Sequence, residues 1–146
     1  MRPQRPSLSE KTAAIAYARA FNTHDLSLLA PLVHDRLRVF DQRNWTPREG
    51  SNFYLGMIGD YFELVPPEKC SMTMELAVVP QAPINENQPR PCVIEYHGGR
   101  PVCTILFQVH GGKIRRIEKR LLPPPTECQL TGVYPGLDTG PTEEVN

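Results

Sequence analysis

The sequence predicts an α+β domain: helices cover one face of a curved antiparallel sheet, a long N-terminal helix comes first, and two further helices follow. Three observations lead to this prediction. Helical apolar periodicity is confined to residues 1–65, strand-like apolar runs fill residues 71–122, and two nearly identical Gly-Gly turns join the last three runs. In the α+β class, the helices and the strands occupy different parts of the sequence, and the strands pair with the strands next to them in sequence.

The first helix has a recognisable start and one apolar face. Ser7 and Glu10 have the spacing of a capping box, and Ser9 is an alternative cap. Apolar side chains then recur at positions i, i+3, i+4 and i+7, which places Tyr17 and Phe21 on the same stripe. The spacing therefore predicts an amphipathic helix that buries both aromatic rings.

A short second helix is expected directly after the first. Asn22 tolerates the left-handed conformation and is expected to end the first helix. Asp25 then caps a helix over residues 26–33, which contains Pro31. Because proline lacks the backbone N–H that an interior helical position needs, this helix should be short or kinked.

One strand and one more helix complete the first half, at residues 36–41 and within residues 48–65. The second half is expected to form four strands. Gly-Gly pairs accept the positive φ of tight hairpin turns, so the last three strands should form an antiparallel meander. The four strands are expected at residues 71–79, 92–97, 101–110 and 114–122.

A single domain over residues 1–146 suits this length, with a core at residues 8–122. Residues 1–7 are expected to form a loose arm. Residues 123–146 are rich in Pro, Gly, Thr and acid, which predicts a tail without core or, alternatively, a strap onto a neighbouring subunit.

Composition narrows the classes of function. Sixteen basic residues balance sixteen acidic ones, whereas a nucleic-acid binder would show a basic excess. No apolar run is long enough to span a membrane, and no secretory leader is recognisable. The four cysteines are widely spaced and are expected to be buried free thiols in a cytoplasmic protein. Neither a metal-ligand spacing nor a nucleotide loop occurs, so we expect no metal and no cofactor.

Two segments carry a resemblance to a known family. Residues 16–26 read AYARAFNTHDL, and residues 107–114 read FQVHGGKI. In these motifs and in the order of its elements, the chain resembles the nuclear transport factor 2-like superfamily, especially its ketosteroid isomerase and SnoaL-like polyketide cyclase branch. Over residues 7–122 the resemblance implies a cone: a bent sheet wraps the long helix and encloses an apolar pocket. It also implies a homodimer through the outer sheet face.

The resemblance implies two catalytic residues. Tyr17 occupies the position of the family's hydrogen-bond donor, and Asp41 that of its base. The position of a second acid falls on Ile105, which cannot donate a hydrogen bond, so the isomerase-type pair of donors is incomplete.

The residues themselves leave alternatives open at both positions. Tyr17 lies on the apolar stripe, where its hydroxyl could meet a ligand oxygen or an ordinary protein partner. Asp41 shares the parity of Leu37 and Val39, so burial would raise its pKa toward that of a useful base. Alternatively, the strand has ended and Asp41 caps the turn toward Trp45.

Other side chains are expected to line the pocket or to flank it. Arg115, Arg116, Lys119 and Arg120 lie on the last strand. Two of one parity either reach into the pocket and favour an anionic ligand or lie on a solvated or dimer-facing surface, and a bulge at the preceding turn decides the parity. The expected pocket wall consists of Phe21, Trp45, Met57, Tyr61, Ile105 and Phe107.

Two functions fit the sequence. The first is cofactor-independent proton transfer of the isomerase, cyclase or dehydratase type on a small apolar, carbonyl-like substrate. The second is a non-catalytic ligand-binding or dimeric assembly module of the same fold. A raised pKa at Asp41 would favour the enzyme, whereas an ordinary or lowered pKa would favour the binding module.

Overall fold

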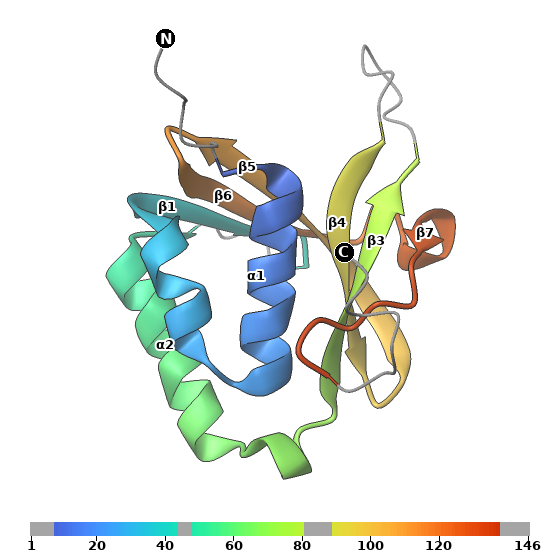
Figure 1. Cartoon of the computed structure of the whole chain (residues 1–146), viewed down its shortest axis with the longest axis horizontal. Coiled ribbons are helices and arrows are strands. Elements are labelled where there is room, and N and C mark those ends of the chain that lie inside the picture. The colour runs from blue at the N-terminus through green and yellow to red at the C-terminus, as the bar shows by residue number, and fades with distance from the viewer. Residues whose placement is uncertain (1–7, 44–47, 81–88, 138–146) are drawn as a thin grey trace, which may run out of the picture.

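The computed structural model describes residues 8–43, 48–80 and 89–137. Two α-helices, α1 (Glu10–Thr23) and α2 (Ser51–Leu64), contribute to one main core against a seven-stranded sheet (Figure 1). Helix α1 packs on β3, β4 and β5, and α2 packs on β1. The strands are β1 (Val33–Asp41), β2 (Arg48–Glu49), β3 (Met72–Val79), β4 (Arg90–His97), β5 (Arg100–His110), β6 (Lys113–Arg120) and β7 (Gln129–Leu130).

The sheet has the order β2-β1-β6-β5-β4-β3-β7. Strands β4 to β6 form the expected antiparallel meander, and all four glycines of its two Gly-Gly turns have positive φ. Strand β3 extends the meander by pairing antiparallel with β4. The prediction of a purely antiparallel sheet was wrong, because β1 pairs with β6 in parallel. Hairpin turns indicate only the pairing of neighbouring strands, and this pairing joins strands far apart in the sequence.

The residues that cap helix α1 differ from those expected first. Ser9 is the N-cap, and its hydroxyl accepts a hydrogen bond from the Thr12 backbone N–H at 3.0 Å. His24, with φ of 55°, adopts the left-handed conformation that we expected at Asn22. The Asn22 side chain instead donates to the carbonyls of Met74 and Pro135 and accepts from the Met74 N–H. Asn22 therefore ties α1 to β3 and to the C-terminal segment.

The predicted second α-helix is replaced by two 3-10 turns, Leu26–Leu28 and Ala30–Leu32. Asp25 caps the first turn as expected, accepting from the Ser27 N–H at 3.1 Å. Pro31 lies in the second turn, where its missing N–H prevents an α-helical hydrogen bond. The two turns fit between α1 and β1 and bury Leu29 completely.

Residues 123–137, expected in a tail without core, pack on the body of the domain. They run from the outer face of the sheet at a 3-10 turn (Pro125–Glu127), through β7 on the edge of β3, to the end of α1, where Pro135 is buried. Glu75, only 3% exposed, holds this segment by accepting hydrogen bonds from the hydroxyl of Tyr134 and the backbone N–H of Gly132.

Among the described residues, no helix is long and apolar enough to cross a lipid bilayer.

Candidate functional site

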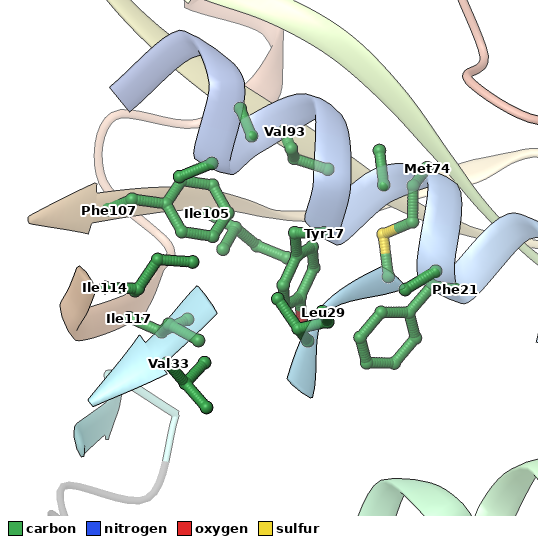
Figure 2. Packing of buried hydrophobic residues seen from close by; sticks show 14 of the residues in the cluster. Tyr17, Phe21, Leu29, Val33, Met74, Val93, Ile105, Phe107, Ile114 and Ile117 are labelled. Atoms are coloured by element: carbon green, nitrogen blue, oxygen red, sulfur yellow. The ribbon is translucent and has the colours of Figure 1, made fainter. Parts of the chain in front are cut away.

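The inner face of the sheet and helix α1 form an apolar wall around Tyr17. Its ring lies 4.6 Å from that of Phe21 and 5.2 Å from that of Phe107, centroid to centroid. Ile105 is fully buried in the same cluster (Figure 2). The structure therefore brings together four residues predicted for the site, Tyr17, Phe21, Ile105 and Phe107.

Two phenol groups meet inside this wall. Tyr17 on α1 is 0% exposed and Tyr54 on α2 is 6% exposed. Within the described part of the chain, neither hydroxyl has a hydrogen-bond partner other than the second phenol. Burial raises the pKa of both phenols, and the contact between their hydroxyls raises the pKa of Tyr17 further and opposes the rise at Tyr54. Two hydroxyl donors thus lie near each other, neutral at physiological pH.

A row of polar side chains crosses the inner face beside the phenols. Glu95 on β4 is only 2% exposed, and its carboxylate lies 2.6 Å from His97 Nε2 and 3.4 Å from Lys119 Nζ. The Cys103 thiol on β5 lies 3.8 Å from the same carboxylate. Lys119 on β6 pairs in register with Asp41 on β1, which extends the row to the next strand.

The charges in this row stabilise one another. Burial alone would raise the pKa of Glu95, but the charge of Lys119 and the hydrogen bond with His97 outweigh it and lower that pKa. Burial would likewise lower the pKa of Lys119, but the charge of Glu95, together with smaller contributions from Tyr54 and Cys103, outweighs burial and raises it. Burial and the nearby Glu95 raise the pKa of Cys103 to about 12, so this thiol stays protonated. Glu95 and Lys119 are therefore an ionised pair within a largely buried site.

Asp41 lies at the end of β1 but does not have the expected raised pKa. The Arg43 side chain donates to both carboxylate oxygens, from Nε to Oδ1 and from Nη2 to Oδ2, each at 2.9 Å. The Arg43 backbone N–H also donates to Oδ1 at 3.0 Å. The hydrogen bonds from the Arg43 side chain lower the pKa of Asp41 in spite of partial burial. The expectation of a raised pKa was wrong because Arg43 binds both oxygens of the carboxylate and stabilises its ionised form. Asp41 remains in the strand and also caps the following turn.

The other predicted wall residues lie in different surroundings. Met57 on α2 is 42% exposed, and its sulfur lies 4.0 Å from Arg48 Nη1. Tyr61, also on α2, is half-buried with its hydroxyl 3.1 Å from the Cys70 sulfur. Trp45 lies outside the described residues.

The basic residues of β6 divide between the two faces of the sheet. A register shift between Gln108 and Val109 on β5 sets the parity, so that Ile117 is buried inside. Lys119 shares the inner face, whereas Arg116 and Arg120 form ion pairs with Glu118 on the outer face. The outer face carries an open basic groove of about 620 Å³, lined by residues that include Arg36, Arg38, Arg115 and Arg116.

The polar row has no set of side chains suited to a resident metal ion. Over residues 8–43, 48–80 and 89–137, no three His, Cys, Asp or Glu side chains gather as metal ligands. Glu95 contacts His97, but it also contacts Lys119, whose positive charge would repel a metal ion.

Three residues of the site were not predicted from sequence, namely Tyr54, Glu95 and Arg43, and Lys119 was one of four basic candidates on the last strand. Tyr54 lies on the apolar stripe that locates α2, so its position carried a weak signal. Glu95 stands in a run that is apolar on both faces, since Val93 packs inside and Ile94 packs outside. Alternation along β4 therefore could not assign Glu95 to either face.

Comparison with known proteins supports the architecture. No protein-family model matches the sequence, and no curated protein sequence matches it. A nuclear transport factor 2-like protein of unknown function from Cytophaga hutchinsonii is similar in structure, with a TM-score of 0.50 and 14% identity over 82% of this chain and 97% of that chain. A SnoaL-like protein of unknown function from Burkholderia thailandensis gives a TM-score of 0.52 and 12% identity over 72% and 87% of the respective chains. At such identities the likeness concerns the fold, and the chain has the nuclear transport factor 2-like fold.

Proposed function

We propose that this protein binds a small, largely apolar molecule through a carbonyl-like oxygen and transfers a proton on it, in a reaction of the isomerase, cyclase or dehydratase type. The observation that carries the proposal is the pair of buried phenol hydroxyls of Tyr17 and Tyr54. Buried polar groups in folded proteins nearly always have partners, and among the described groups these two hydroxyls have only each other. A ligand oxygen is the natural acceptor for both.

In this proposal the phenols stabilise negative charge that develops on the ligand oxygen. Tyr17 is the donor that the family resemblance implies, and Tyr54 supplies the second donor that Ile105 cannot provide. Two preorganised donors in a site with little water stabilise an oxyanion more than they stabilise the neutral carbonyl. The apolar wall formed by Phe21, Ile105 and Phe107 would hold the rest of the molecule.

Asp41 is the proposed base, and it would act in its ionised form. Its pairing with Arg43 keeps it ionised but also weakens it as a proton acceptor, because the two hydrogen bonds stabilise the carboxylate. Proton transfer therefore requires Arg43 to release at least one oxygen of Asp41 when the ligand binds.

By the criterion set from the sequence, the lowered pKa of Asp41 favours the second candidate, a ligand-binding module without catalysis, over proton transfer. A carboxylate that is hydrogen-bonded at both oxygens can simply hold the Arg43 guanidinium in place at the rim of the site. In this alternative the two phenols still bind the ligand oxygen, and Asp41 only positions Arg43.

Two probes separate these functions. Binding of 2-naphthol, whose hydroxyl oxygen can accept from both phenols, is followed by fluorescence. Exchange of the acidic C–H protons of 2-tetralone in D₂O is followed by proton NMR. Tyr17→Phe and Tyr54→Phe are each expected to weaken naphthol binding roughly tenfold. Tyr134→Phe, which removes a hydroxyl outside the proposed site, is the matched control.

The outcomes assign the function. Exchange that Asp41→Asn abolishes while naphthol affinity is preserved supports proton transfer with Asp41 as base. Binding without any catalysed exchange supports the binding module. Equal affinity in wild type, Tyr17→Phe and Tyr54→Phe would contradict the phenol pair as the ligand site and both functions with it.

The family resemblance also implies a homodimer through the outer sheet face. The groove that includes Arg36, Arg38 and Arg116 lies on this face, so a two-fold contact must place acidic groups opposite these arginines. Sedimentation at low and high salt measures whether such a dimer forms and whether ion pairs hold it.

A further inference from the structure

Two of the four cysteines come together on the outer face of the sheet, away from the proposed ligand site. Cys92 on β4 is 0% exposed and belongs to a small apolar cluster with Ala77, Ile94 and Leu106. Cys128, which follows the 3-10 turn of the C-terminal segment, packs against this cluster. Both are free thiols. One thiol therefore belongs to the sheet and the other to the segment that covers it.

The Cys128 thiol is held in place by the chain around it. Its sulfur lies 3.9 Å from the Thr104 hydroxyl and 3.7 Å from the Pro124 carbonyl oxygen. Thr104, itself fully buried on β5, also donates to the Pro123 carbonyl at 2.8 Å. These contacts fix the start of the C-terminal segment against β5 and hold Cys128 against the cluster that contains Cys92.

The two thiols differ in acidity. The hydrogen bond between them lowers the pKa of Cys128 to about 7 and raises that of Cys92. A thiolate is the nucleophilic form of cysteine, so Cys128 is the reactive member and Cys92 is the neutral thiol beside it. Cys103, by contrast, is buried next to Glu95 and has a pKa near 12.

A small oxidant can reach this pair through one of its members. Cys128 is half-buried, whereas Cys92 is 0% exposed. Oxidation must therefore begin at Cys128.

We propose that Cys92 and Cys128 form an oxidisable dithiol that locks the C-terminal segment onto the sheet. Hydrogen peroxide is the oxidant: the Cys128 thiolate attacks one peroxide oxygen, the O–O bond breaks, and hydroxide leaves, which gives a sulfenic acid. The Cys92 sulfur then attacks the Cys128 sulfur, the S–O bond breaks, and water leaves with the thiol proton. Both sulfurs are oxidised by one electron each, and the peroxide is reduced.

The bridge would act on more than the two sulfurs. The segment that it anchors continues through Thr131, which bonds to the Leu76 carbonyl, to Pro135, which bonds to Asn22 at the end of α1. A covalent link at Cys128 keeps the start of this segment on the sheet. It also closes a loop in the unfolded chain, which lowers the entropy of that chain and stabilises the folded state.

The first test is the mass and the map of the oxidised full-length protein. Dilute hydrogen peroxide is expected to lower the intact mass by 2 Da, and peptide mapping without reduction should find Cys92 linked to Cys128. Dithiothreitol should reverse the change. A disulfide that involves Cys70 or Cys103, or oxidation of Cys128 to sulfinic acid with no bridge, would overturn the proposal.

The second test measures proximity without oxidation. Phenylarsine oxide bridges two thiols that lie close together, so the wild type should bind one equivalent, and Cys92→Ser and Cys128→Ser should bind none. Cys70→Ser, whose thiol contacts Tyr61, is the matched control and should behave as the wild type. Oxidised wild type should melt at a higher temperature than reduced wild type. Arsenical binding that survives Cys128→Ser would contradict the pairing.

Discussion

The hydroxyls of Tyr17 and Tyr54 are unusual because the fold buries them with no partner in the described chain other than each other. A buried donor that lacks an acceptor costs about 1–3 kcal/mol, which folding must offset elsewhere. Apolar packing around the Tyr17 ring supplies that offset, since Phe21 and Phe107 both contact it. The site thus keeps two donors available at a cost in stability, as expected where a ligand completes the structure.

Glu95 provides the prediction at the scale of a residue. Replacing it by Gln leaves the largely buried Lys119 without its counter-charge, so Glu95→Gln should lower the free energy of unfolding at pH 7 by about 3 kcal/mol. Chemical denaturation measures this loss. Glu68→Gln on the exposed turn before β3 is the control and should change it little.

The pH dependence of the same variant follows from the direction of the pKa shift. The folded-state pKa of Glu95 is lowered, so its contribution is present above the ordinary carboxyl range and is lost as pH falls through the lowered pKa. Denaturation curves below about pH 4 should therefore converge for wild type and Glu95→Gln. A difference that stays constant down to pH 2 would show that the loss at pH 7 is not due to charge.

At the scale of elements, the Asn22 side chain connects α1, β3 and the C-terminal segment. Asn22→Ala leaves two carbonyls and one N–H without partners where α1, β3 and the C-terminal segment meet. We expect a loss of about 2–4 kcal/mol in the free energy of unfolding, measured in urea. Asn52→Ala on the exposed side of α2 is the matched control. Similar losses in both variants would mean that this connection contributes nothing specific.

The elements themselves could largely be predicted from sequence, because each has local signals. The Gly-Gly turns located the meander, and the apolar stripes located α1 and α2. The parallel pairing of β1 with β6 has no local signal, since it depends on how distant parts of the chain meet. The side of the sheet on which Lys119 lies depends on one register shift near Gln108, and a shift of one residue reverses every side chain beyond it.

The candidate site was predicted in part for the same reason. Tyr17 and its apolar neighbours follow from helical spacing, which is a local property. The grip of Arg43 on Asp41 and the grouping of Glu95 with Lys119 are properties of tertiary structure. Hydrogen bonds of this kind decide the direction of a pKa shift, so the raised pKa expected for Asp41 could not be corrected from the sequence alone.

For the whole molecule, the C-terminal segment is a cover for the outer face. A chain ending at Leu122 would expose the apolar cluster around Ile94 and Leu106 and would leave Glu75 without the partners from this segment. We expect a lower melting temperature and stronger binding of an apolar dye. A chain ending at Leu137 keeps all of these contacts and is the control. Equal melting of the two truncated chains would contradict the role of the segment as a cover.

The parallel pairing of β1 with β6 also has a consequence for the order of events during synthesis. Val33 pairs with Ile114, so about 80 residues must leave the ribosome before β1 acquires this neighbour. Until then the apolar side of α1 lacks most of its sheet, because β3, β4 and β5 are made in the same interval. During this interval the apolar side of α1 in the nascent chain stays exposed, and chaperones bind exposed apolar segments of this kind.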